Sequence, residues 1–79
     1  MAKKSLSELC PGERARVSEL CTGGDMRRRL LDIGLIPETL VECVGQSPLG
    51  DPKAYLVRGK IIAIRCVDAR GVRLISKGH

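Results

Sequence analysis

Short apolar segments, separated by glycine and proline, recur along the whole chain and set its expected architecture. Turn signals such as Pro11-Gly12 and Gly71 stand at short intervals, which suits strands better than long helices. The stretches between them are rich in β-branched and other apolar residues, as strands are. The segments expected to form strands are residues 14–20, 40–44, 55–57, 61–66 and 72–75. The pattern predicts a mostly β domain of about five strands.

One segment has the periodicity of a helix instead. Met26, Leu30 and Ile33 recur at i, i+4 and i+7, so they share one stripe of a helix that turns about 100° per residue. Leu31 lies roughly 140° from Met26 on the same helix. We therefore expect one short helix with a single buried stripe, and we expect Leu31 to stay at its surface.

The residues around this helix mark its two ends. Asp25 is expected to cap the free N–H groups at the start. Gly34 can adopt the left-handed conformation that ends a helix, and Pro37 prevents continuation. These signals predict a helix of about two to three turns.

The pattern leaves the orientation of one predicted strand open. In the segment 40–44, either Leu40 and Val44 or Val41 and Cys43 point inward, and the pattern does not decide between the two faces.

The connections between the later strands carry their own signals. The loop Ser47–Pro52 contains two prolines and one glycine, which predicts a stiff hairpin connection in which Asp51 caps its own turn. Asp68 is expected to cap a single helical turn at residues 68–71, just before the last strand.

Length and composition bound the class of protein. The 79 residues make one domain, 1–79, with about residues 5–76 expected to be ordered. Phe and Trp are absent and Tyr55 is the only aromatic residue, so the core must consist mainly of aliphatic side chains. No apolar run approaches the ~18 residues of a membrane span, and no signal peptide is visible. We expect a cytoplasmic protein.

The four cysteines are expected to be reduced, because neither their spacing nor a targeting segment supports disulfides. Cys43 and Cys66 lie in apolar, strand-like runs and are interpreted as buried small hydrophobic residues. Cys10 and Cys21 lie at loop edges, where a reactive thiol or a soft-metal ligand remains an alternative.

The charge and the histidine content indicate a binding module, not an enzyme. A net charge of +5 suits an acidic protein surface, anionic lipid or nucleic acid, but one tyrosine is a poor supply of stacking platforms for nucleic acid. The sole histidine is His79, at the end of the chain, so no histidine-supported nucleophile can be built.

The sequence resembles the FeoA family over almost its whole length. The resemblance is carried, in order, by LSELCPGERARV at 6–17, RRRLLDIGLIP at 27–37, SPLGDPKAYLVRG at 47–59 and IAIRCVDARGVRLI at 62–75. The most specific pieces are Arg29, Leu30, Asp32 and Gly34 in the helix, and the PLGDP loop with Pro48, Gly50 and Pro52. This resemblance implies an SH3-like small β-barrel with one principal helix.

The resemblance also implies a function: a cytoplasmic accessory protein of bacterial ferrous iron uptake that binds FeoB, a membrane transporter with a GTP-binding domain. On this interpretation a docking patch has an apolar centre and a charged rim. The residues expected in this patch are Leu31, Leu35 and Leu49 in the centre, with Arg27, Arg28 and Asp51 around it.

Two features set this chain apart from the family pattern. The family commonly has Pro-Gly after the helix, whereas this chain has Pro37-Glu38, for which we expect a type I turn without a positive φ. Transition-metal binding, for example of ferrous iron, is ascribed to the family, but the sequence offers no clear ligand set. A small basic nucleic-acid-binding barrel and a cysteine-based metal sensor or carrier remain as alternatives.

Overall fold

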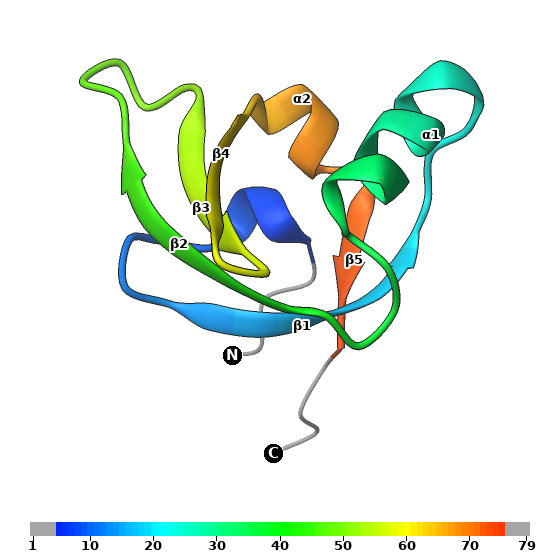
Figure 1. Ribbon diagram of the computed structural model, residues 1–79. Helices are drawn as coiled ribbons and strands as arrows, with labels where there is room; N and C mark the ends of the chain where they lie inside the picture. Colours follow the sequence, from blue (N-terminus) through cyan, green and yellow to red (C-terminus); the bar gives the residue numbers. More distant parts are fainter. Residues whose placement is uncertain (1–4, 76–79) are drawn as a thin grey trace.

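The computed structural model describes residues 5–75 and confirms a mostly β architecture (Figure 1). Its five strands form one antiparallel sheet in the order β4-β3-β2-β1-β5. The strand β1, predicted over residues 14–20, has those same bounds. The elements are the 3-10 turn η1 (Leu6–Glu8), β1 (Arg14–Leu20), α1 (Gly24–Ile33), β2 (Leu40–Gln46), β3 (Lys53–Val57), β4 (Lys60–Ile64), α2 (Cys66–Ala69) and β5 (Val72–Leu74).

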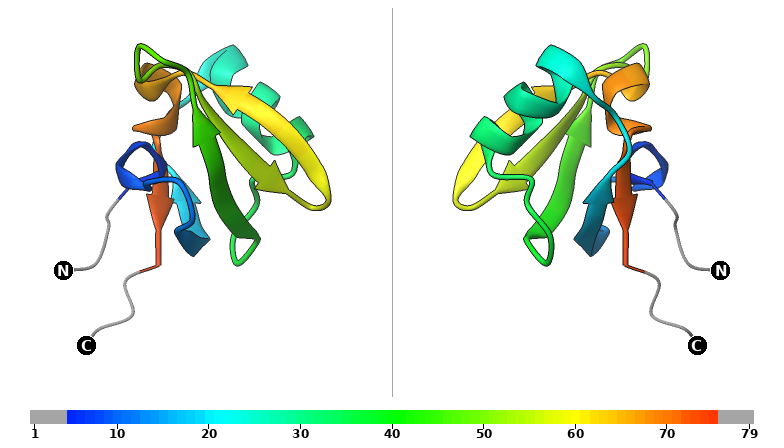
Figure 2. Two further views of the ribbon diagram at one scale, coloured as in Figure 1. Left: turned by 90° about the vertical axis from the view of Figure 1, so that its left-hand side faces the viewer. Right: turned by 90° about the vertical axis from the view of Figure 1, so that its right-hand side faces the viewer.

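The sheet curls around one core, as the two side views show (Figure 2). Strand β1 connects the two ends of the sheet, because it pairs with β2 near Arg14 and with β5 near Leu20. The helix α1 and the short elements η1 and α2 lie on the inner side of the curled sheet (Figure 1). The turn η1 packs against both α2 and β5.

The core is aliphatic apart from Tyr55, which is completely buried in strand β3. Its hydroxyl donates a hydrogen bond of 3.1 Å to the carbonyl oxygen of Leu6 in η1. Lys53, at the start of the same strand, donates from Nζ to the carbonyls of Ser7 and Leu9 at 2.9 and 2.8 Å. Two side chains of β3 therefore hold the N-terminal turn to the sheet.

The structure shows which residues of β2 point inward, a question that the sequence pattern left open. Val41 and Cys43 are completely buried, whereas Leu40 and Val44 are 45% and 40% exposed. The prediction that Cys66 lies buried in a strand is wrong. Strand β4 ends at Ile64, and Cys66 begins α2 as a half-buried residue.

The helix α1 has the predicted length and the predicted buried stripe. Leu30 is buried, and Met26 and Ile33 pack beside the core. At the C-terminus Gly34 has φ +112°, and a Cβ there would lie 2.8 Å from Cδ of Arg58. Glycine is therefore needed at this position both for its backbone conformation and for the close passage of Arg58.

Both predicted aspartate caps are wrong. The helix α1 is capped by Gly23 with no side-chain hydrogen bond, so Asp25 lies inside its first turn. The residue before α2 is Arg65, and Asp68 lies inside that short helix. In each case the helix begins earlier than the acidic residue, which leaves the carboxylate in the first turn, where the helix dipole favours it.

The turn after α1 also differs from the prediction. Glu38 has φ +72°, and the N–H of Thr39 donates to the carbonyl of Ile36 at 3.1 Å. With Pro37 in second place and a positive φ in third place, this is a turn of the type II kind. The expected type I turn is wrong: Glu38 adopts the conformation that glycine would adopt, at a cost typical of left-handed non-glycine residues.

Replacing Glu38 by glycine should therefore stabilise the protein. We expect Glu38→Gly to raise the free energy of unfolding in urea by about 0.5–1 kcal/mol, because the relieved backbone strain exceeds the extra chain entropy of the unfolded state. Glu38→Ala is the control, since it removes the same side chain but keeps the strain. A loss of stability in Glu38→Gly would show that the turn is not strained.

Tyr55 provides a direct optical test of the core. Its burial, together with the negative charges that Cys43, Cys66 and Asp51 can carry, raises the pKa of the Tyr55 hydroxyl far above its usual value. A raised folded-state pKa stabilises the fold below the unfolded-state pKa of about 10, and this contribution is lost as the pH rises above it.

Because Tyr55 is the only aromatic residue, phenolate absorbance reports on it alone. The folded protein should show no phenolate at a pH about one unit above 10, and phenolate should appear together with unfolding followed by circular dichroism. Reversible ionisation near pH 10 in a still folded chain would contradict the buried position.

Candidate functional site

The loop between β2 and β3, residues Ser47–Pro52, is fastened by its own hydrogen bonds. The Ser47 hydroxyl accepts from the Asp51 N–H at 3.1 Å and donates to the Asp51 carbonyl at 2.8 Å. The Ser47 carbonyl accepts from the Gly50 N–H at 2.8 Å, and the Ser47 N–H donates to the Pro52 carbonyl at 3.1 Å. Ser47, and not the carboxylate of Asp51, therefore fastens this turn.

The side chain of Asp51 connects this loop to another element. Its Oδ1 accepts a hydrogen bond of 2.9 Å from the N–H of Cys66, the first residue of α2. The prediction that Asp51 caps its own turn is therefore wrong for its carboxylate. This group instead holds the loop to a helix 15 residues further along the chain.

The tip of this loop presents a bare apolar side chain. Leu49 is 93% exposed, the highest value among the large apolar residues from 5 to 75. Leu49 stands between Ser47 and Asp51, which both take part in the hydrogen bonds of the loop. The loop thus holds a fully exposed leucine on a backbone that is already ordered, which suits an anchor for a partner.

The outer side of α1 carries the other part of the predicted patch. Leu31 is 37% exposed, as predicted, and Arg27 and Arg28 are also exposed. The Nη1 of Arg27 donates to the Leu20 carbonyl at 3.2 Å. Leu35 does not belong to this surface: it is completely buried, because the chain turns into the core directly after Gly34.

The structure does not bring the two halves of the predicted patch together. Figure 1 shows the loop with Leu49 and the helix α1 with Leu31 at opposite sides of the molecule, with α2 between them. One docking patch centred on both leucines is therefore replaced by two separate surfaces.

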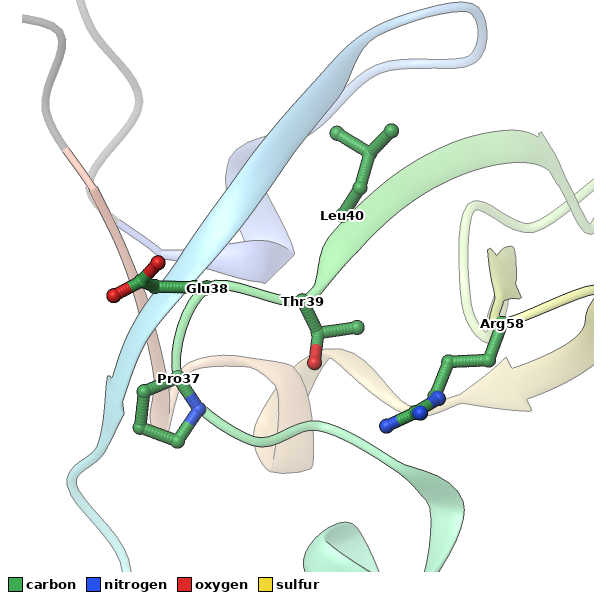
Figure 3. A pocket seen from close by; sticks show the side chains of 5 residues that line it. All are labelled: Pro37, Glu38, Thr39, Leu40 and Arg58. Atoms are coloured by element: carbon green, nitrogen blue, oxygen red, sulfur yellow. The ribbon is translucent and has the colours of Figure 1, made fainter.

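A third surface, on the outer side of the sheet, was not predicted. Two adjoining hollows of about 370 Å³ each share Leu40 and Arg58. Pro37, Glu38 and Thr39 complete the first hollow (Figure 3). The second is lined by Arg14, Leu40, Glu42, Leu56, Arg58 and Gly59. The only sequence signal for this groove was the undecided orientation of the segment 40–44, which left open whether Leu40 is exposed.

The sequence and the fold of this chain match those of known proteins. The family model of the FeoA domain matches residues 4–75. The chain belongs to the FeoA family. This family is associated with ferrous iron transport, and the SH3-like fold expected from the resemblance is confirmed. No curated protein sequence matches the chain.

Solved structures of FeoA proteins superpose closely on this FeoA-family chain. FeoA of Chlorobium tepidum is 32% identical, with a TM-score of 0.83 over 94% of this chain and 70% of that chain. Iron(II) transport protein A of Clostridium thermocellum is 31% identical, with a TM-score of 0.86 over 94% of this chain and 46% of that chain. FeoA of Stenotrophomonas maltophilia, solved with zinc and described as an SH3 domain protein, is 27% identical, with a TM-score of 0.80 over 90% of this chain and 88% of that chain.

The FeoA motif residues have structural roles here. Leu30 is part of the core, and Gly34 ends α1 and lies under Arg58. Arg29 and Asp32 are exposed on α1. In the PLGDP loop, Pro48 and Pro52 are exposed and Gly50 has φ +87°. These residues shape the elements that carry the exposed leucines.

No metal site is formed by the described part of this FeoA-family chain. Residues 5–75 contain no group of three or more His, Cys, Asp or Glu side chains placed to hold an ion. Cys10 and Cys21 are exposed, Cys43 is buried and Cys66 is half-buried. His79, the one histidine, lies outside the described residues. Among the helices of residues 5–75, none has the length and apolar character needed to cross a bilayer.

The bond from Asp51 to Cys66 can be tested on the free protein. We expect Asp51→Ala to lower the free energy of unfolding by about 1 kcal/mol, the usual cost of a lost helix cap. The amide of Cys66 should also exchange faster with deuterium, as measured by NMR. Asp25→Ala is the control, because the Asp25 carboxylate makes no cap bond. Unchanged exchange at Cys66 would show that Asp51 does not hold α2.

Proposed function

We propose that this chain is an accessory protein of ferrous iron uptake that docks on a FeoB-type transporter at the cytoplasmic face of the membrane. The observation that carries the proposal is Leu49, a fully exposed apolar side chain on a loop that the fold holds in place. Family membership supplies the pathway, and the loop supplies the means of contact.

An ordered loop favours binding for a definite physical reason. A flexible loop must lose conformational freedom when it binds, whereas this loop has already lost it on folding. Burying the leucine side chain in a partner then contributes about 1.5–3 kcal/mol. An exposed leucine on an ordered loop is thus an efficient anchor for a protein partner.

The charge of the chain supports docking beside a membrane. A net charge of +5 is attracted to the anionic lipids of a cytoplasmic leaflet and to acidic protein surfaces. Arg27 and Arg28 on α1 lie in exposed positions from which they can make such contacts, with Leu31 beside them. We propose α1 as a second, weaker contact region that is separate from the loop.

The alternative functions receive less support. Tyr55, the only aromatic residue, is completely buried and offers no platform on which bases could stack. The cysteines are dispersed between surface and core, and no three ligands converge in residues 5–75. Metal binding remains part of the proposal only as a secondary property that the zinc complex of the Stenotrophomonas maltophilia protein suggests.

Binding to the full-length transporter tests the proposal. FeoB from the same organism is placed in lipid nanodiscs, and its affinity for this protein is measured with and without a GTP analogue over a range of salt. We expect saturable binding that survives moderate salt, because an apolar anchor is not screened. Leu49→Glu should weaken it at least tenfold, the loss expected when about 1.4 kcal/mol or more of apolar burial is removed.

Two further variants separate the surfaces. Ile75→Glu is the control, since Ile75 is an exposed apolar residue directly after β5 and lies outside the loop and α1. Leu31→Glu reports on α1 and should have a smaller effect than Leu49→Glu. Absence of binding in every nucleotide state would refute the partnership, and equal effects of Leu49→Glu and Ile75→Glu would refute the role of the loop.

A further inference from the structure

The groove on the outer side of the sheet has a chemistry of its own. Its two hollows meet at Leu40 and Arg58, so an apolar and a cationic side chain stand together in the middle of the groove. Leu40 is 45% exposed although it begins a strand, and Pro37 and Leu56 extend the apolar lining on either side. We infer that this groove binds an extended, acidic segment of a partner protein, with an apolar residue on Leu40 and a neighbouring carboxylate on Arg58.

Arg58 is placed as a receptor for an anion. Within residues 5–75 no hydrogen bond or ion pair engages its guanidinium group, so its charge is not neutralised by a neighbour. Its aliphatic stem passes close over Gly34, where even a Cβ would come within 2.8 Å of the Arg58 Cδ. Figure 3 shows the guanidinium end reaching across the hollow toward Thr39. Packing of the stem thus orients a free guanidinium, whose fork of N–H donors matches a carboxylate.

The other charged residues of the groove do not compete with this role. The side chain of Glu38 points away from the hollow (Figure 3). Arg14 and Glu42 are opposite residues of β1 and β2 and carry opposite charges, so together they add no net charge to the groove. The uncompensated charge of the groove is therefore that of Arg58, and complementarity favours an acidic occupant.

The backbone around the groove is strained in two places. Glu38 and Arg58 are the two residues other than glycine that have a positive φ within 5–75, +72° and +51°, and both line the same hollow. Arg58 stands at the first position of the two-residue β3–β4 turn, where asparagine, aspartate or glycine is the usual choice. A left-handed arginine costs stability that a more suitable turn residue would avoid, which accords with a binding role for its side chain.

The apolar lining argues for a peptide instead of a free anion or nucleic acid. A phosphate ion would engage Arg58 but leave Leu40 and Leu56 in water, whereas an apolar residue beside a carboxylate covers both kinds of surface. No aromatic residue lines either hollow, so a base would find no stacking partner. The loop that carries Leu49 precedes β3, whereas Arg58 follows this strand and none of the loop residues lines the groove, so this inference does not rest on the docking of the loop.

A titration followed by amide chemical shifts in NMR spectra tests the inference. The probe is a blocked hexapeptide of alternating leucine and glutamate, and the matched probe has glutamine in place of glutamate. We expect saturable shifts confined to residues 37–42 and 56–59, at millimolar or lower peptide concentration. The glutamine peptide should bind at least fivefold more weakly. Shifts centred elsewhere, or equal binding of the two peptides, would overturn the inference.

Variants of the protein make the test specific. Arg58→Asn removes the guanidinium and places a residue that tolerates the left-handed turn, so the fold should be at least as stable while peptide affinity falls at least fivefold. Arg28→Gln is the control of equal charge, because Arg28 is exposed on α1, outside the groove. Unchanged affinity in Arg58→Asn would refute the role of Arg58.

A competition with inorganic phosphate separates a peptide groove from a bare anion site. We expect millimolar phosphate to weaken peptide binding only modestly, because the apolar contacts remain. Phosphate that produces the same shifts and fully displaces the peptide would show a simple anion site and overturn the inference.

Discussion

A single buried hydrogen bond, from the Tyr55 hydroxyl to the Leu6 carbonyl, joins the N-terminal turn to strand β3 of the sheet. From this contact a series of further contacts leads to the other elements. The turn η1 packs against α2, and the first amide of α2 receives the Asp51 carboxylate from the loop between β2 and β3. One buried aromatic side chain is thus linked, through two short helical elements, to the loop that presents Leu49.

The elements of this fold could be predicted wherever one local rule decides the conformation. Strand β1 and the buried stripe of α1 follow from periodicity, and the end of α1 follows from Gly34. Some errors are local, because both helices begin earlier than their acidic residues suggest, and one arises where a distant group takes over a local role. Asp51 could be recognised as a cap but not as a cap of α2, because its partner Cys66 lies far along the chain and meets it only in the folded protein.

The candidate surfaces show the same division. Exposure of Leu31 follows from its angular position on one helix, whereas burial of Leu35 depends on how the chain re-enters the core after Gly34. The groove at Arg58 has no continuous sequence signal, since its residues come from β1, β2, β3, the β3–β4 turn and the connection after α1. Family resemblance indicated ferrous iron transport, but it could not indicate a surface assembled from three separate stretches of the chain.

The loop that carries Leu49 precedes β3 and the turn that carries Arg58 follows it, so the two proposed contacts lie at opposite ends of this strand, which has a consequence for stoichiometry (Figure 1). Under the two proposals made above, both contacts can be occupied at the same time, and one copy of the protein would then bridge two partners or two parts of one transporter. A bridge of this kind works best at intermediate abundance. When copies outnumber the sites, each site is filled by a separate copy and the bridged assembly is lost, so the amount of this small protein relative to its partners would itself regulate assembly.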